Sequence, residues 1–530
     1  MANAFVIKKS HFRIFPRIAS IYSPEDWVML LAFLAGLLAT VWAFVNRYIT
    51  AYGDAESHLN IAKRVVDSLT PGFAQLGGIW LPLPHILLMP FVYFDIFWRS
   101  GLAGSIVSGI AFVVSALYIY KTTQLLTKNT GASFLASLIF ILNPNVLYLQ
   151  STPMTELPLI VFFVLSTYYF ILFMEEGELY PLIMSALFGL FATLSRYDGW
   201  ALVLMEAGIL FLYYLWRRKF QKFEGRLILF ATLAFFGIFL WLLWSFLILG
   251  DPLYFTHSQF SANSQQMGWL AKGQLPAYHD IAVSLEYYFV ASMSSAGVLV
   301  FIASILGMLV FLFDRTAKNR FYILLLLLVP FFFNVITLFL GQSIMFMPGL
   351  TPTTFEWTLF NVRYGVLMAP FAAIFVGYLA AKNGYFGKIL LAIIVLAQTL
   401  LFLSGFSPVL AFEDGTRGLS SATAKLPDAQ YWLARNYDDG LILMDDYKRV
   451  LSIIRTPIPM ENIIYIGNKP YWEESLVAPE KYANWIIIQR DDDLWRRIYE
   501  DPGLNGRLYK YFEKAYTSDD ILIFKRIGDN

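Results

Sequence analysis

The 530-residue sequence contains no cysteine and few charged residues. Without cysteine the chain can form no disulfide, no thiolate metal site and no cysteine nucleophile. Cysteine usage therefore gives no evidence about whether the protein lies in an oxidising or a reducing compartment. Only 15% of the residues are charged, whereas soluble domains carry about 25%. The formal net charge is +1, so no overall field attracts nucleic acid, and neither a P-loop nor a GxGxxG phosphate loop occurs. Most of the chain therefore faces lipid.

Apolar segments that approach bilayer length recur from residue 27 onward. A spanning helix needs about 20 mostly apolar residues. The first apolar run follows the basic segment 1–26 and is long enough to stay as an anchor. The segments are 27–46, 81–98, 101–120, 131–149, 156–173, 181–196, 198–216, 226–249, 287–313, 320–341, 361–382 and 386–405.

Basic loops test this count, because Lys and Arg are enriched on the cytoplasmic side. Twelve full spans would put the loop at 121–128 opposite the basic N-terminus. The segment 81–98 contains three prolines, so we expect a re-entrant or interfacial helix there and about 11 transmembrane helices. The N-terminus is then cytoplasmic, and these basic loops share its side: 121–128, 217–226, 314–320 and 382–388.

The composition changes near residue 406, where charge rises and short apolar stretches alternate with helical ones. This pattern indicates a small α/β domain. The sequence therefore predicts a polytopic all-α membrane protein with a small C-terminal extracytoplasmic α/β domain. The predicted parts are a cytoplasmic N-terminus (1–26), a transmembrane module (27–405) with external loops 47–100, 150–156, 250–285 and 342–360, and the outer domain (406–530).

Three polar residues follow the first span in the stretch YGDAESHLN. Asp54 is a candidate helix cap and a candidate general base, and both roles are compatible. In a helix Asp54 shares a face with His58 while Glu56 points away, whereas in an extended segment all three point the same way. The sequence leaves both arrangements open.

Other polar residues interrupt apolar segments at the predicted outer side. Glu156 is either a helix cap or a functional acid. The functional role is a candidate because an unpaired carboxylate at the mouth of an apolar span is unfavourable in free energy. Arg196 forms an ion pair with Asp198 within a hairpin or binds an anion such as phosphate. Arg363 is likewise a candidate to bind an anion; alternatively, its side chain extends along apolar surface to reach the lipid headgroups. His85 and His257 suit hydrogen-bonded interfacial histidines, and with Asp54, Glu56 and Glu156 they offer oxygen and nitrogen ligands for a divalent cation.

Three stretches in this order resemble the GT-C glycosyltransferases, most closely family 39, the protein O-mannosyltransferase and aminoarabinose transferase group. GDAESHLNIAKRV resembles the family's first acidic motif, here Asp-x-Glu where many members have Asp-Glu. WLPLPHILLMPF resembles its HPPL-type segment, with His85 at the histidine. NPNVLYLQSTPMTELPLIVFF places Glu156 at the second acidic position.

The resemblance implies a membrane enzyme that moves a sugar from a polyprenyl phosphate, dolichyl or undecaprenyl phosphate, to an acceptor hydroxyl on a protein, lipid or glycan, with inversion. We favour the outer face of a prokaryotic plasma membrane over the endoplasmic reticulum. The implied catalytic residues are Asp54 as base, Glu56 and Glu156. Donor phosphate is assigned to Arg196, Arg363 and Arg64, with Lys63 as a further choice. A Mg²⁺ or Mn²⁺ ion is assigned to Asp54, Glu156 and His257.

Three other functions remain open from the sequence. An oligosaccharyltransferase of the same superfamily is disfavoured because no WWDxG-like motif occurs in the C-terminal region. A transporter or flippase of lipid-linked sugars would carry charges through the bilayer centre, whereas the candidate residues gather at one interface. A non-catalytic scaffold would tolerate alanine at Asp54 and Glu156.

Overall fold

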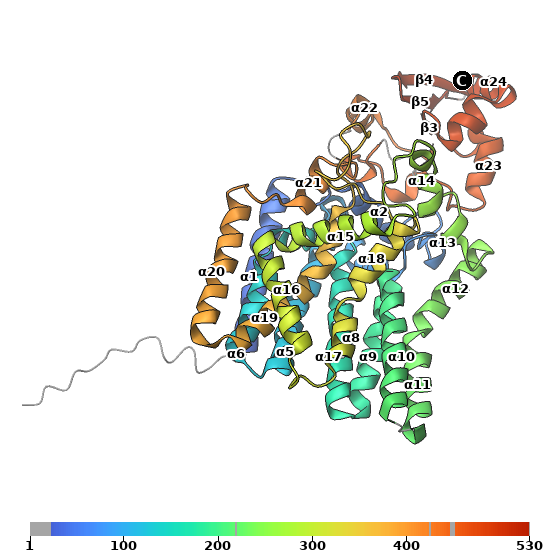
Figure 1. Cartoon of the computed structure of the whole chain (residues 1–530). Coiled ribbons are helices and arrows are strands. Elements are labelled where there is room, and N and C mark those ends of the chain that lie inside the picture. The colour runs from blue at the N-terminus through green and yellow to red at the C-terminus, as the bar shows by residue number, and fades with distance from the viewer. Residues whose placement is uncertain (1–22, 218–219, 423–425, 446–450, 529–530) are drawn as a thin grey trace, which may run out of the picture.

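The computed structural model describes residues 23–217, 220–422, 426–445 and 451–528. The basic residues predicted to hold the N-terminus inside lie outside this range. A bundle of helices carries a small sheet domain at one end (Figure 1), which confirms the predicted fold class. The bundle consists of α1 (Pro24–Val45), α5 (Leu102–Thr127), α6 (Thr130–Ile141), α8 (Glu156–Glu176), α9 (Leu179–Ser195), α10 (Asp198–Arg217), α11 (Phe220–Ala234), α12 (Phe236–Leu249), α16 (Val298–Phe313), α17 (Arg320–Leu327), α18 (Val329–Phe339), α19 (Ala369–Lys382) and α20 (Gly384–Leu403).

Shorter helices cover the end of the bundle that faces the sheet domain (Figure 1). The predicted re-entrant segment 81–98 is occupied by α3 and α4, and α3 is only 10 residues long, half the length that a bilayer requires. These shorter helices are α2 (Gly53–Val66), α3 (Leu83–Val92), α4 (Asp95–Ser100), α7 (Pro144–Leu149), α13 (Tyr254–His257), α14 (Ala262–Ala271), α15 (Ile281–Ala296), α21 (Leu410–Thr416), and the 3₁₀ segments η1 (Phe73–Gln75) and η2 (Val362–Met368).

The prediction of one continuous span at 287–313 is wrong. Helices α15 and α16 meet at an angle of 111°, and α15 lies across the end of the bundle (Figure 1). The break is at Gly297, whose φ of 88° suits glycine, and Gln398 accepts the hydrogen bond of the Leu299 amide at 3.0 Å. Among the described residues, six helices are long and apolar enough to cross a membrane, or nine if each bent pair counts once. The predicted 11 spans remain a prediction.

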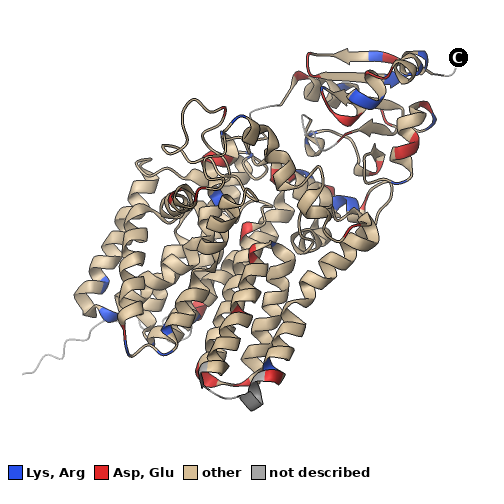
Figure 2. Ribbon diagram, turned by 45° about the vertical axis from the view of Figure 1, so that its right-hand side comes forward, with Lys and Arg blue, Asp and Glu red and all other residues tan. Residues whose placement is uncertain are grey.

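Contacts between turns show that the predicted basic loops gather at one end of the bundle. Lys388 donates a hydrogen bond to the Asn129 side chain, and Lys128 pairs with Glu175 in the acidic last turn of α8. Arg226 donates to the Gly177 carbonyl oxygen at 2.7 Å. Opposite charges therefore meet at this end, while the middle of the bundle is almost free of charge (Figure 2).

One buried carboxylate does lie within the bundle. Glu206 of α10 accepts hydrogen bonds from Ser166 of α8 at 2.9 Å and from Ser185 of α9 at 3.4 Å. It lies eight residues along α10 from Asp198, which is about 12 Å at 1.5 Å per residue. These hydroxyls satisfy the acid and tie three helices together.

The C-terminal domain contains a five-stranded sheet in the order β2-β1-β3-β5-β4. Strand β1 pairs in parallel with β2 and β3, whereas β5 runs antiparallel to both β3 and β4. The strands are β1 (Ile442–Met444), β2 (Ile463–Ile464), β3 (Trp485–Gln489), β4 (Phe512–Thr517) and β5 (Ile521–Arg526), and the helices include α22 (Asp428–Asn436), α23 (Tyr471–Val477) and α24 (Pro502–Tyr511).

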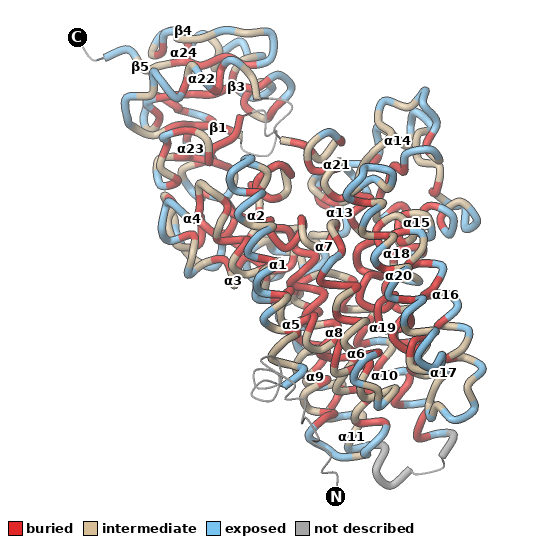
Figure 3. The backbone as a smooth tube through the Cα atoms, turned by 90° about the vertical axis from the view of Figure 1, so that its left-hand side faces the viewer, coloured by how far each residue is buried: buried red, intermediate tan, exposed pale blue. Residues whose placement is uncertain are grey.

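The sheet has two apolar faces because successive strand residues point to opposite sides. One face contains Leu443 and Ile486 and packs on α23 and α24. The other contains Ile442 and Ile487 and shares a hydrophobic core with α2, α3 and α4. Buried residues accordingly continue from the sheet through α2 into the bundle (Figure 3). The first loop after α1 and the last domain thus fold as one body.

Candidate active site

The open question about the YGDAESHLN stretch is answered by α2, which is helical from Gly53. Tyr52 is the N-cap residue and makes no side-chain cap bond. Asp54 lies in the first turn, where the helix dipole favours a negative charge, and its side chain binds Arg363 instead of capping. Glu56 is two residues further, about 200° around a helix with 3.6 residues per turn. It therefore points away from Asp54.

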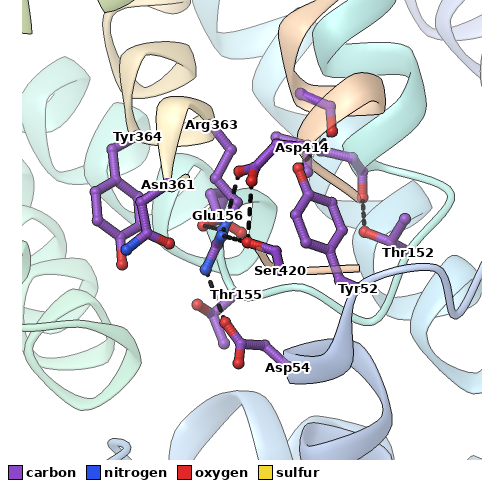
Figure 4. Close-up of polar contacts among 12 residues, drawn as sticks. Tyr52, Asp54, Thr152, Thr155, Glu156, Asn361, Arg363, Tyr364, Asp414 and Ser420 are labelled. Atoms are coloured by element: carbon purple, nitrogen blue, oxygen red, sulfur yellow. Dashed lines mark hydrogen bonds and ion pairs between the residues drawn. The ribbon is translucent and has the colours of Figure 1, made fainter. Parts of the chain in front are cut away.

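Arg363 lies in η2 and is the centre of a buried cluster of charged side chains (Figure 4). Its Nη2 atom donates to Asp54 at 2.8 Å, and its Nε atom donates to Glu156 at 3.2 Å. Its Nη1 atom lies 3.6 Å from a carboxylate oxygen of Asp414. Because Arg363 is only 3% exposed, removing it would leave three acids to share a poorly solvated space.

A second arginine joins the cluster through Glu156. Arg196 donates to the same Glu156 oxygen at 3.2 Å and to the Thr155 hydroxyl at 3.0 Å. It also pairs with Asp198 at 3.3 Å, as the hairpin alternative proposed, and Asn334 donates to Asp198. Glu156 is the first residue of α8, Arg196 follows the end of α9, and Asp198 is the first residue of α10. These three helix ends therefore bring the charged groups together.

Tyr364 lies against both guanidinium groups. Its ring centroid is 5.2 Å from Cζ of Arg363 and 4.9 Å from Cζ of Arg196, within the range of cation–π attraction. The hydroxyl of Tyr288 in α15 donates to the Tyr364 carbonyl oxygen. The bend that turns α15 across the bundle therefore supports the segment that carries Arg363.

Asp414 and Ser420 are site residues that the sequence does not reveal. They follow the last bundle helix, and the Ser420 hydroxyl donates to Asp414 at 3.0 Å while accepting from Arg363 at 3.3 Å. The stretch AFEDGTRGLS has the composition of an ordinary polar linker. Its place shortly after the last apolar segment is the only sequence feature that could have pointed to a site residue there. Burial raises the pKa of Asp414 to about 6, although Arg363 and Ser420 oppose the shift.

This raised pKa predicts a pH-dependent stability difference between the wild type and Asp414→Asn. An unfolded aspartate has a pKa of about 4, so the folded protein holds the extra proton between about pH 4 and 6. Stability from this group is then fully present below pH 4 and is lost as the pH rises through 6. Asparagine cannot ionise. The melting temperature of the variant relative to wild type, followed by scanning fluorimetry in detergent, should rise between pH 4 and pH 7. A constant difference would contradict the prediction.

Glu56 does not join Asp54, contrary to the predicted catalytic set. Its carboxylate accepts from the Ser452 hydroxyl at 2.7 Å and from the Ile454 amide at 3.3 Å, both in the C-terminal domain. Two predicted phosphate ligands also lie elsewhere: Arg64 stacks on Tyr465, 3.9 Å from the ring centroid, and Lys63 pairs with Asp67 and Asp95. The helical rotation of α2 directs Glu56 and Arg64 toward the sheet domain and Lys63 toward α4.

The histidines do not form the predicted metal site. His257 pairs with Asp251 at 2.6 Å, and within the described residues no group of three or more His, Asp or Glu side chains is placed to hold a metal. His58 meets His85 at 2.9 Å between ring nitrogens. Burial, with His58 beside it, lowers the pKa of His85 well below its usual value. This pair is therefore a buried contact between α2 and α3 in which His85 favours its neutral form.

A family model described as dolichyl-phosphate-mannose-protein mannosyltransferase matches residues 84–244. The matched segment runs from α3 to α12 and contains Glu156, Arg196 and Asp198. No curated protein matches the sequence.

Solved structures match over nearly the whole chain. ArnT from Cupriavidus metallidurans, crystallised with undecaprenyl phosphate, has a TM-score of 0.52 at 11% identity, covering 95% of this chain and 99% of that one. The Archaeoglobus fulgidus oligosaccharyltransferase complex with Zn and sulfate has a TM-score of 0.47 at 13% identity, covering 94% and 73%. AglB from the same organism, with an inhibitory peptide and a dolichol-phosphate, has 0.48 at 12% identity, covering 94% and 74%. The chain thus shares the fold of the ArnT structure.

Proposed function

We propose that this chain is a glycosyltransferase of the GT-C class, which its family match and its fold support, and that it transfers a sugar from a polyprenyl-phosphate donor to an acceptor hydroxyl. The carrying observation is that Asp54 keeps 29% of its side chain exposed while Glu156 and Asp414 are fully buried. Asp54 is thus the carboxylate of the cluster that a substrate can reach. We place the reaction on the outer face, opposite the end where the basic loops gather.

In the proposed reaction Asp54 acts as general base. It takes the proton of the acceptor hydroxyl, whose oxygen forms a bond to the anomeric carbon as the bond from that carbon to the phosphate oxygen breaks. One displacement inverts the anomeric centre, and polyprenyl phosphate leaves with the bonding electron pair. A positioned base of this kind contributes about 10²–10⁴-fold to rate.

Arg363 supplies a link between the base and the leaving group. In the resting site its Nη2 atom is paired with Asp54 at 2.8 Å. When Asp54 takes the proton it loses its charge, and the guanidinium then has a donor to turn toward the phosphate oxygen that gains charge. Such a preorganised donor stabilises the transition state. Arg196 stays bound to Glu156 and Asp198 and holds the cluster in place.

A divalent cation has a weaker basis in the described residues. Asp54 and Glu156 both bind Arg363, His257 lies with Asp251, and no three acidic or histidine side chains of the described ranges are placed to hold a metal. Mg²⁺ or Mn²⁺ would have to displace the guanidinium of Arg363.

The test uses purified protein in detergent, where transport between compartments is impossible. Radiolabelled decaprenyl-phosphate mannose, glucose and arabinose are each incubated with the protein and delipidated cell envelope as the acceptor source, with and without EDTA. We expect one donor to release decaprenyl phosphate and to transfer label in an amount proportional to enzyme. Movement of intact donor across vesicles, without donor breakdown in detergent, would instead identify a transporter.

A further inference from the structure

We propose that Glu56 is a positioning residue through which the C-terminal domain sets the rotation of α2 and hence the position of Asp54. The inference rests on the proposed function, in which Asp54 is the base. It assigns the C-terminal domain a part in the reaction, although the domain's own sheet holds none of the clustered charges described above.

The contacts of Glu56 are those of a fixed buried group. Its side chain is 7% exposed and accepts from Ser452 at 2.7 Å and from the Ile454 amide at 3.3 Å. Ser452 is itself fixed, because its amide donates to Gln430 at 2.8 Å and its carbonyl oxygen accepts from the same side chain at 2.9 Å. A buried carboxylate with two donors is expensive to misplace, so it resists rotation of α2.

The opposite side of the α2 N-terminus is held by the linker after α20. The Gly53 amide donates to the Ser420 carbonyl oxygen at 2.7 Å, and the Ala422 amide donates to the Ala51 carbonyl oxygen at 2.7 Å. The Tyr52 hydroxyl donates to the Ala411 carbonyl oxygen. These bonds fix the backbone at the start of α2. The bonds of Glu56, one turn inside, add a restraint from the C-terminal domain close to Asp54, while His58 and Lys63 hold the helix from α3 and α4.

Asp54 needs this restraint because its work depends on distance. Its oxygen lies 2.8 Å from Arg363 in the resting site and must come within hydrogen-bond reach of an acceptor. A displacement of about 1 Å at a reacting group can cost about 100-fold in rate. Rotation of α2 about its axis would move Asp54 and Glu56 together, since they are part of one rigid helix.

The experiment compares Glu56→Ala, Glu56→Gln and Ser452→Ala in the full-length protein, using the decaprenyl-phosphate sugar that wild type consumes. Glutamine can accept from the Ile454 amide and donate to Ser452, so it keeps both bonds without the charge. We expect Glu56→Ala to lower kcat by about 10- to 100-fold, with the donor KM within about twofold because the bound donor is unchanged. We expect Glu56→Gln to stay within about threefold of wild type, and Ser452→Ala to lie between them.

Arg99→Ala provides the matched control at the same domain boundary. Arg99 of α4 donates to the carbonyl oxygens of Thr456 and Ile458, so its loss weakens docking through α4. Its pairing partner Asp95 keeps its bond to Lys63 of α2. We expect a lower melting temperature with kcat close to that of wild type. An equal fall of kcat in Arg99→Ala and Glu56→Ala would overturn the proposal in favour of general docking.

Two further results would separate the inference from the function on which it rests. If the kcat of Glu56→Gln falls as far as that of Glu56→Ala, then Glu56 acts through its charge. The positioning role would then be wrong, whereas the proposed glycosyltransferase function, with another group as the base, would stand. If wild type consumes none of the donors, the proposed function itself fails. Unchanged kcat in Glu56→Ala would overturn the inference alone.

Discussion

Asp54→Asn is expected to lower transfer by about 10³-fold or more, at the upper end of what a general base contributes. Asparagine matches aspartate in size but has no basic oxygen with which to take the acceptor proton. The fold should survive, since Arg363 keeps Glu156 and Asp414 as partners and Asp54 is not the cap of α2. Steady-state donor breakdown and the melting temperature of the purified variant measure both parts.

Glu56→Gln is the control for this result, because it removes a neighbouring carboxylate from the same helix but keeps its hydrogen bonds. The two substitutions should differ by at least about 100-fold in kcat. Near-normal turnover in Asp54→Asn would show that another group takes the proton, and Asp54 would then serve only to hold Arg363.

Arg363→Ala should be the most damaging change to both stability and activity. It leaves Asp54, Glu156 and Asp414 close together with Arg196 as the remaining described guanidinium of the cluster, bound to Glu156 and Asp198. Removing one partner of a buried ion pair costs about 3–5 kcal/mol, because the remaining charge stays buried. We expect a large fall in melting temperature and no detectable transfer, read by scanning fluorimetry and by release of decaprenyl phosphate.

Arg363→Lys separates the two effects if the alanine variant does not fold. Lysine restores one positive charge but cannot bridge three carboxylates with a planar fork. Stability should recover in part while transfer stays at least about tenfold below wild type. Arg226→Ala at the opposite end, which loses bonds to Gly177 and Tyr214, should lower stability without changing kcat of the folded protein. Wild-type turnover in Arg363→Lys would contradict the role of the fork.

Composition and topology were enough to predict that Asp54, Glu156, Arg196 and Arg363 lie at one end of the bundle. Charged groups are rare in this chain, so each interruption of an apolar segment stands out, and the alternation of spans fixes which interruptions share a side. The proline-rich stretch at 81–98 was also readable, since its residues favour a short helix.

The remaining features depend on contacts between distant residues, for which the sequence contains no local signal. The partners of Glu56 are 396 and 398 positions away, and Asp414 looks like part of an ordinary linker until Arg363 is placed beside it. The bend at Gly297 was equally hidden, because a single glycine within an apolar run is compatible with a straight helix. Here tertiary packing decides, through Gln398 and the backbone of α15.

The union of the first loop with the last domain has a consequence for how the protein is made. Ribosomes add about 5–20 residues per second, so Glu56 waits roughly 20–80 s for Ser452, 396 positions later. During that interval the apolar face of α2 that includes Leu59 and Ala62 lacks the surface that covers it, and the base lacks its restraint. If the proposed function and the role of Glu56 hold, we expect an unfinished chain to be inserted but to transfer sugar more slowly than the finished chain.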